Sequence, residues 1–303
     1  AVKLQTYTPD TLTLNADRPE FRITGTLWEG ETLHSLYRQA ATPWEWHPRL
    51  KRLTEELGLV FFSTPFDETA VEFLAQLEVP AFKVASFELV DLPLIAYMAG
   101  KGRPLILSTG LAAFEEIQEA VAAARRGGAS EIILLKCTSA YPAPPEDMNL
   151  RTIPHMAETF GVPAGLSDHT LGWTVPVAAV ALGACVVEKH FTLSRSRPGP
   201  DSAFSLEPPE FKAMVAAIRT VEKALGEERY GPQGSEAASR VFRRSLFVCR
   251  DLAPGEAFSP ENVRSIRPGY GLAPKYLPRI LGRRARGAIP RGTPLTWDLV
   301  EEP

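Results

Sequence analysis

Short apolar runs alternate with longer amphipathic stretches over the first two thirds of the chain. The apolar runs are rich in β-branched and aromatic residues and have the length of buried strands. They cover residues 2–7, 59–66, 81–87, 104–110, 132–139, 164–170 and 185–192. Stretches such as 67–78 and 113–128 instead place apolar residues at helical spacing, and Gly127-Gly128 ends the second of them. Strands that alternate with helices predict a parallel sheet with right-handed crossovers.

Each of these seven runs begins with apolar residues and ends with polar ones. In a TIM barrel the carboxyl ends of the strands carry the chemistry. A doubly wound sheet is the alternative, but it is disfavoured because no Gly-rich turn follows a strand. We therefore expect an α/β fold of the TIM-type (β/α)8 class. Seven runs are one fewer than eight strands, and Ala1 directly precedes a strand, so we expect the first βα unit to be missing from this sequence.

The pattern changes near residue 240, where strand-like and Gly/Pro-rich segments replace the alternation. Two of these segments share a spacing, 37 residues apart. The matching pairs are Gly255 and Gly292, Phe258 and Leu295, Ser259 and Thr296, and Val263 and Val300. A weak internal repeat predicts a small domain with pseudo-symmetric halves. We expect a barrel domain at residues 1–228, a linker at 229–239 and a small domain at 240–303.

Composition narrows the class of protein. The chain has 303 residues, of which 45% are hydrophobic and 23% charged, as in ordinary globular proteins. No apolar run is long enough to span a membrane, and no secretion signal is visible. The cysteines Cys137, Cys185 and Cys249 form no closely spaced pair, which favours reduced thiols over disulfides or a cysteine zinc site. These features predict a cytoplasmic protein.

The net charge of −3 is unevenly distributed. Residues 240–303 hold 12 Arg and Lys against 6 Asp and Glu, which leaves about −9 for the rest of the chain. A basic segment can indicate nucleic-acid binding. Here the arginines are scattered without accompanying aromatic residues, and the acidic main domain is available as a partner. We therefore expect neither nucleic acid nor membrane as a partner.

Two histidines stand at the ends of neighbouring predicted strands, His169 in "GLSDHT" and His190 in "CVVEKHFT". Side chains alternate along a strand, so Glu188 and His190 point to one face and Lys189 to the other. A lone strand histidine is more often a satisfied core residue than a ligand. Two inward histidines on adjacent strands can bind one divalent ion and leave it open positions for a substrate oxygen. Both interpretations stay open at this point.

A second group of polar residues follows five of the strands. It consists of Lys3, Ser63, Thr64, Lys83, Ser86, Ser108, Thr109 and Ser139. Lysines and hydroxyls at barrel strand ends are suited to a phosphate or a carboxylate. Ser and Thr also cap the helices that follow strands, so one such residue would indicate little. Their recurrence on five strands predicts an anion site.

Several motifs together resemble the sialic acid synthase family. They are "FSTPFD", "FKVASFE", "STG", "KCTSAYP", "GLSDHT", "EKHFT" and "GPDSAFSL", in this order. The tail, "FRRSLFV" followed by "IRPGYGL", resembles the antifreeze-like (SAF) domain of these enzymes. Within the family, "TPWEWH" and "KCTSAYPAPPEDMNLRTIPHM" resemble the pseudaminic acid synthases. N-acetylneuraminate synthases usually have a histidine where Lys136 stands.

The resemblance implies a reaction and a role for each candidate residue. The family condenses phosphoenolpyruvate with an open-chain amino sugar and releases phosphate. Phosphoenolpyruvate would be held by Lys3, Thr64, Lys83, Ser86, Ser108, Ser139 and Ser167. His169 and His190 would bind a divalent ion, Mn2+ or else Mg2+ or Co2+, that polarises the aldehyde. Gln5, Glu88, Tyr141 and Glu188 would be the catalytic polar groups, and Asp201 and Arg267 would contact the sugar.

The resemblance also implies an assembly. Arg267 of the small domain would reach the sugar in the partner subunit's barrel, which predicts a homodimer with swapped small domains. The family's first strand carries a catalytic glutamate and an Asn-His pair, and this sequence has no such segment.

Three alternatives to a pseudaminic acid synthase remain. The first is the same chemistry on another amino sugar, in an N-acetylneuraminate or legionaminate synthase. The second is a metal-dependent pyruvate aldolase, which would need no phosphate site, and the third is a truncated sugar-binding remnant. The loop "TPWEWHP" leaves a further choice, because Trp44 and Trp46 would form either an apolar wall at the pocket mouth or a buried helix start.

Overall fold

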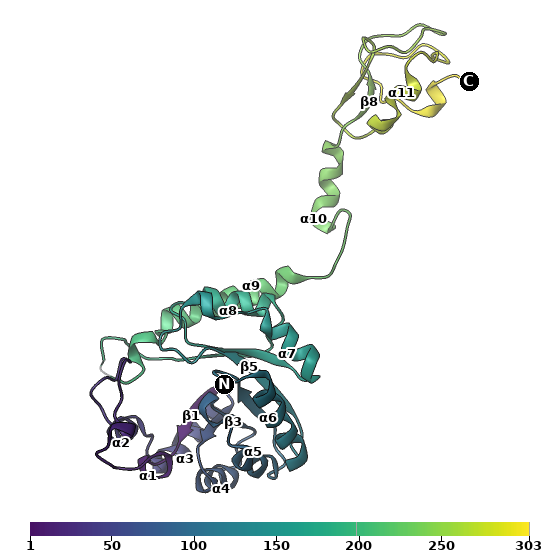
Figure 1. The fold of residues 1–303 in the computed structure, drawn as a ribbon. Coiled ribbons are helices and arrows are strands. Elements are labelled where there is room, and N and C mark those ends of the chain that lie inside the picture. Colours follow the sequence, from purple (N-terminus) through teal and green to yellow (C-terminus); the bar gives the residue numbers. More distant parts are fainter. Residues whose placement is uncertain (198, 303) are drawn as a thin grey trace. The chain divides into compact units, whose positions relative to one another are not determined.

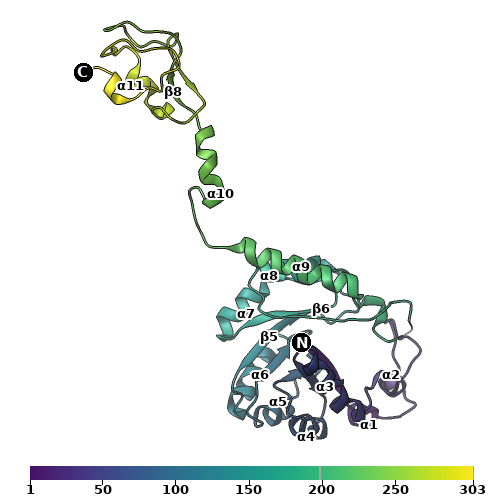
Figure 2. The same ribbon diagram turned by 180° about the vertical axis from the view of Figure 1, so that it is seen from behind.

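The seven apolar runs form seven parallel strands of one sheet, ordered β1 to β7 as in the sequence. The computed structural model describes residues 1–197 and 199–302. The strands are β1 (Val2–Thr6), β2 (Phe61–Pro65), β3 (Phe82–Val84), β4 (Leu105–Ser108), β5 (Ile132–Cys137), β6 (Ala164–Asp168) and β7 (Val187–Lys189). The sheet curls, and helices cover its outer side (Figures 1 and 2). The expected TIM-like fold is confirmed as a seven-stranded half-barrel.

Helices connect consecutive strands of this sheet. Those of the first unit are α1 (Pro9–Leu12), α2 (Leu33–Ala40), α3 (His47–Glu56), α4 (Glu68–Gln76), α5 (Leu92–Ala99), α6 (Phe114–Gly127), α7 (Thr152–Phe160), α8 (Thr174–Ala181) and α9 (Pro208–Leu225). The core between helices and sheet contains the fully buried Phe82, Leu105, Leu107 and Leu134. Apolar side chains on the outer face of each strand thus fix the sheet against the helices, and the polar strand ends remain for the site.

The chain divides into two units, Ala1–Gly226 and Glu227–Pro303. The second unit begins with α10 (Gly234–Ala237), which lies inside the segment expected to be a linker, and also contains α11 (Leu277–Ile280). Strands β8 (Ser245–Val248) and β9 (Val263–Ile266) pair antiparallel within it.

The internal repeat corresponds to similar structure in the two halves of the second unit. Gly255 and Gly292 both have positive φ angles, 75° and 87°, which residues with a side chain rarely adopt. Phe258 and Leu295 are both buried in the core of this unit, with Val263 and Val300 beside them.

Among residues 1–197 and 199–302, no helix has the length and apolar character needed to cross a membrane.

Candidate active site

Glu188, on β7, lies at the centre of the polar strand ends. Its Oε1 accepts hydrogen bonds from Lys3 Nζ at 3.0 Å and from Ser167 Oγ at 3.3 Å. Its Oε2 lies 3.9 Å from Lys83 Nζ. Burial alone would raise the pKa of Glu188, but the charges of Lys83, Lys3 and His190 and the hydrogen bond from Lys3 lower it to about 2. The carboxylate therefore stays ionised and holds two lysines toward the barrel interior.

Residues that are in register on neighbouring strands form one row across the sheet and bring these groups together. Cys137 on β5 is paired in register with Ser167 on β6, and Ser167 with Glu188 on β7. Lys3 comes from β1, at the opposite edge of the sheet, so the Lys3–Glu188 ion pair joins the two edge strands across the interior. The alternation read from the sequence is confirmed here, because Glu188 faces this row while Lys189 pairs with Asp168 instead.

Lys83 is a deeply buried cation of the site, with a side chain 1% exposed. Its Nζ donates to Ser108 Oγ at 2.6 Å and to the carbonyl oxygen of Val84 at 2.7 Å. Burial lowers the pKa of Lys83 to about 8, although Glu188 counteracts part of this effect. A buried ammonium with so few partners is suited to a phosphate or carboxylate ligand.

The serines of two loops meet beside this lysine. Ser86 Oγ accepts a hydrogen bond from the backbone N–H of Gly110 at 3.1 Å. A Cβ at Gly110 would lie 2.2 Å from Ser139 Oγ and 2.7 Å from Ser86 Oγ, so glycine is needed for the loops after β3, β4 and β5 to converge. The buried hydroxyl of Thr64, on β2, has no hydrogen-bond partner among the described residues. Such an unpaired buried hydroxyl is available to a ligand.

The two strand-end histidines lie side by side. The ring centroids of His169 and His190 are 5.3 Å apart. His169 Nδ1 is 2.9 Å from the carbonyl oxygen of Thr138, and His190 Nδ1 is 3.4 Å from Asp201 Oδ2. An acceptor at Nδ1 orients each ring and leaves Nε2 for a metal ion, which is the usual arrangement of metal-binding histidines.

A buried ion pair lies behind the histidines and fixes their strands. Lys189 Nζ is 2.5 Å from Asp168 Oδ2, and both side chains are at most 1% exposed. Thr170 donates its hydroxyl and its backbone N–H to the same carboxylate. Asp168 and Lys189 are register partners and directly precede His169 and His190. The pair thus holds β6 and β7 in the register that brings the two rings together.

Glu88 and Tyr141 lie in the loops above this row. Burial raises the pKa of Glu88 to about 7, and its buried Oε2 has no hydrogen-bond partner among the described residues. Tyr141 packs on His169 at 4.4 Å between ring centroids and on Phe204 at 5.3 Å. Burial raises the pKa of Tyr141, so its hydroxyl stays protonated. Gln5 is half-buried on β1 and in register with Thr64.

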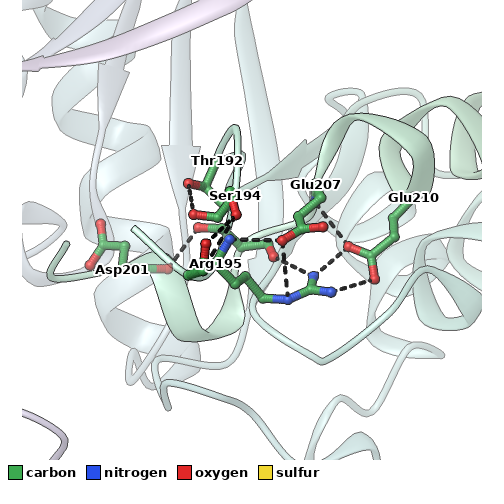
Figure 3. Close-up of polar contacts among 8 residues, drawn as sticks. Thr192, Ser194, Arg195, Asp201, Glu207 and Glu210 are labelled. Carbon is green, nitrogen blue, oxygen red and sulfur yellow. Dashed lines mark hydrogen bonds and ion pairs between the residues drawn. The ribbon is translucent and has the colours of Figure 1, made fainter. Parts of the chain in front are cut away.

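Asp201 lies in the loop between β7 and α9, and a network of contacts anchors this loop (Figure 3). Arg195 donates its backbone N–H to Glu207 Oε1 at 2.7 Å and its Nη2 to Glu210 Oε1 at 2.9 Å. Ser205 Oγ donates to the carbonyl oxygen of Asp201 at 2.7 Å. Contacts with the start of α9 thus hold the loop in which Asp201 lies beside His190.

Cys137 is a site residue that the sequence did not single out. Its Sγ is 3.8 Å from His169 Nδ1 and 3.9 Å from Ser139 Oγ. Burial would raise the pKa of the thiol, but His169 and the hydroxyls of Ser86 and Ser167 lower it to about 7. The spacing "KCTS" gave no signal, because a single small residue in a strand is normally core.

The three remaining candidates lie outside this cluster. Arg267 is exposed in the second unit, and its role in a partner's barrel stays a prediction. Trp44 packs on Phe73 at 4.9 Å between ring centroids and donates Nε1 to the carbonyl oxygen of Tyr7, as expected of a helix start. Trp46 is 56% exposed, so the alternative of a helix start with both tryptophans buried does not hold for this residue.

Comparison with known proteins agrees with the fold and the motifs. The model of the NeuB family matches residues 1–230, and that of the SAF domain matches residues 243–301. The chain is 48% identical to a pseudaminic acid synthase of Helicobacter pylori, over 99% of this chain and 88% of that protein. It is 45% identical to a pseudaminic acid synthase of Campylobacter jejuni, over 97% and 86%. The crystal structure of an N-acetylneuraminic acid synthetase from Leptospira borgpetersenii superposes with a TM-score of 0.69 at 31% identity and covers 79% of each chain.

Proposed function

The chain belongs to the NeuB family, and on this premise we propose that it is a pseudaminic acid synthase. It condenses phosphoenolpyruvate and water with the open-chain aldehyde of 2,4-diacetamido-2,4,6-trideoxy-L-altrose, and it forms pseudaminic acid and inorganic phosphate. The observation that carries the proposal is the identity of 45% and 48% to proteins of that name over nearly the whole chain.

The site supports a phosphoenolpyruvate position beside Lys83. The substrate carries a phosphate and a carboxylate, and Lys3 and Lys83 supply two cations to neutralise them. Around these cations lie the hydroxyls of the proposed binding set, Thr64, Ser86, Ser108, Ser139 and Ser167. Glu188 balances the lysine charges before substrate enters, which keeps both ammonium groups oriented without ligand.

The donor set of His169 and His190 fits a divalent ion. Both rings have an acceptor at Nδ1, which leaves their Nε2 atoms as ligands, and the ring centroids lie 5.3 Å apart. We propose Mn2+, with Mg2+ or Co2+ as alternatives. When bound, the ion supplies a Lewis acid for the aldehyde oxygen.

The acid–base work falls to Glu88 and Tyr141, in the loops that follow β3 and β5. Glu88 has a pKa of about 7, so near neutral pH it can accept or donate a proton at the sugar. The protonated hydroxyl of Tyr141 serves as a hydrogen-bond donor to the growing alkoxide. Asp201 orients His190 and, with Gln5, offers oxygen and amide groups to the sugar.

The substrate is tested by steady-state kinetics with phosphoenolpyruvate and three amino sugars. These are the 6-deoxy diacetamido sugar, N-acetylmannosamine and the precursor of legionaminic acid, and phosphate release is followed. We expect the highest kcat/KM for the 6-deoxy-L-altrose derivative. A preference for either other sugar would reassign the substrate, and sugar binding without phosphate release would support a remnant. Turnover of free pyruvate would indicate an aldolase.

We also propose that the protein works as a homodimer in which Arg267 of one copy contacts the sugar in the barrel of the other. Support comes from its exposure and from the planar guanidinium, which suits hydroxyl and acetamido oxygens. The excess of basic residues in the second unit complements the acidic first unit.

A further inference from the structure

A β-hairpin-like loop, residues 22–32, lies between α1 and α2. Its two arms are joined by a bridge between Arg22 and Thr32 and by a hydrogen bond from Ile23 N to Glu31 O at 2.9 Å. Most of its side chains are exposed, including Leu27 at 56%. Trp28, near the tip, is half-buried and therefore differs from its neighbours.

Trp28 reaches two loops that surround the histidine pair. Its ring lies 5.8 Å from that of Tyr141, which itself packs on His169. Its Nε1 donates to the carbonyl oxygen of Pro200 at 3.0 Å, next to Asp201. The hairpin therefore extends from the β1 edge of the sheet to the loops that follow β5 and β7.

This single hydrogen bond anchors the hairpin. Within the described part of the chain, it is the only hydrogen bond that links residues 22–32 to anything outside residues 17–36. The acceptor loop has several anchors by contrast, because Arg195 contacts Glu210 (Figure 3) and Ser205 donates to the carbonyl oxygen of Asp201. Trp28 thus holds a weakly attached hairpin against a fixed part of the site.

The ring of Trp28 completes an aromatic rim around the proposed sugar position. Tyr141 and Phe204 already face the histidines, with Phe204 at 5.0 Å from His190 between ring centroids. The face of an indole contacts methyl groups favourably, but it offers a hydroxyl no donor and only a weak π acceptor. Its only donor, Nε1, is occupied by Pro200.

We propose that Trp28 is a specificity-determining residue that packs on the 6-deoxy methyl group of the sugar. The inference rests on the proposed function, since the preferred sugar carries a methyl group where N-acetylmannosamine carries a hydroxymethyl group. The hydroxymethyl group places a hydroxyl against a surface that pairs with it only weakly. Trp28 thereby takes the role that the sequence offered to Trp44 and Trp46.

The test compares Trp28→Ala and Trp28→Phe with Leu27→Ala, an exposed neighbour on the same hairpin. Loss of a methyl contact in an apolar site changes kcat/KM by roughly 10- to 200-fold. We expect Trp28→Ala to lose at least about tenfold in kcat/KM for the 6-deoxy sugar and less than about threefold for N-acetylmannosamine. The KM for phosphoenolpyruvate should stay unchanged. Trp28→Phe should be intermediate, and Leu27→Ala should behave as wild type.

Calorimetric titration of each sugar into wild type and Trp28→Ala gives a second readout that does not depend on turnover. Selective loss of affinity for the 6-deoxy sugar supports the inference. Equal losses for both sugars, or none, overturn it while the proposed function stands. If wild type itself binds or turns over only N-acetylmannosamine, the proposed function fails before the variants are compared. Thermal unfolding of all three variants checks that each is folded.

Discussion

Buried charges define the site at the scale of single residues. The Lys83 side chain is 1% exposed and that of Glu188 is 19% exposed. The pKa values of both groups are lowered, for different reasons. Burial dominates for Lys83 and lowers its pKa, whereas the charges of Lys83 and Lys3 outweigh burial for Glu188 and keep it ionised. A cation whose pKa lies within one or two units of neutrality binds an anion in a pH-dependent way.

Removal of the Lys83 charge should therefore weaken phosphoenolpyruvate binding. Lys83→Met keeps most of the side-chain volume and loses a charge-assisted contact of about 1.5–3 kcal/mol, so the KM for phosphoenolpyruvate should rise more than tenfold. Since Lys83 is protonated only below its pKa of about 8, the wild-type KM should rise above that pH, and the variant should not show this rise. Lys101→Met, which removes a surface ion pair with Glu72, is the control. An unchanged KM in Lys83→Met would make this lysine structural.

Ionisation of Glu88 should destabilise the folded protein. The folded protein holds its proton up to pH 7, whereas an exposed glutamate loses it near pH 4.5. Stability from the bound proton is present at acidic pH and is lost as pH rises through this window. Glu88→Gln should therefore be more stable than wild type at pH 8, by about 1–3 kcal/mol, and gain little at pH 4. Urea unfolding at the two pH values measures this difference in stability, and an equal difference at both pH values would contradict the prediction.

The same variant tests the acid–base role. The kcat of Glu88→Gln should fall by about 10²- to 10⁴-fold.

The sequence predicted the facing of the site residues well where strand periodicity applies. Alternation places Glu188 and His190 on one face, whereas the alignment of Cys137, Ser167 and Glu188 in one row is a finding of the structure, because it depends on the strand register. It could not predict Trp28, since its partner Pro200 is 172 residues away and both lie in loops without periodicity. Contacts between loops depend on how the finished sheet curls.

At the scale of elements, close approach between loops shapes the anion site. The loops after β3, β4 and β5 meet at Gly110, where a side chain has no room. The sequence showed the serines of these loops but not the need for glycine between them, because "STG" also reads as a helix entry.

Gly110→Ala should therefore weaken phosphoenolpyruvate binding more than sugar binding. The added methyl would overlap Ser139 Oγ and Ser86 Oγ, and overpacking of this kind costs about 1–3 kcal/mol. We expect the KM for phosphoenolpyruvate to rise at least about fivefold, with a smaller change for the sugar. In the control Gly100→Ala the nearest atom is 3.4 Å from the new methyl, so kinetics should be unchanged. Wild-type kinetics in Gly110→Ala would show that the serines do not contact the substrate.

At the scale of the whole molecule, the candidate residues are divided unequally between the two units. The first unit holds every candidate residue except Arg267. Both parts were visible in the sequence, from the change of pattern near residue 240 and from the 37-residue repeat. The proposed contact of Arg267 with the sugar in another copy could not be predicted from sequence periodicity, because it depends on how two copies assemble.

Subunit mixing tests this assembly. His190→Ala removes an imidazole of the barrel, and Arg267→Ala removes the guanidinium of the small domain, so each variant alone should be inactive. Mixed dimers would contain one site with an intact barrel and an intact arginine, which gives at most about half of wild-type activity per mixed dimer by symmetry. If subunits exchange and no activity returns, Arg267 acts within its own chain or not at all.

The most direct test of the synthase as a whole is the stoichiometry of its reaction. Wild-type protein is incubated with Mn2+, phosphoenolpyruvate and the 6-deoxy diacetamido sugar, and phosphate and the nine-carbon acid are quantified together by colorimetry and mass spectrometry. We expect one phosphate for each molecule of pseudaminic acid, and no phosphate without the sugar. Phosphate release that does not need the sugar, or a product of another mass, would contradict a condensation at this site.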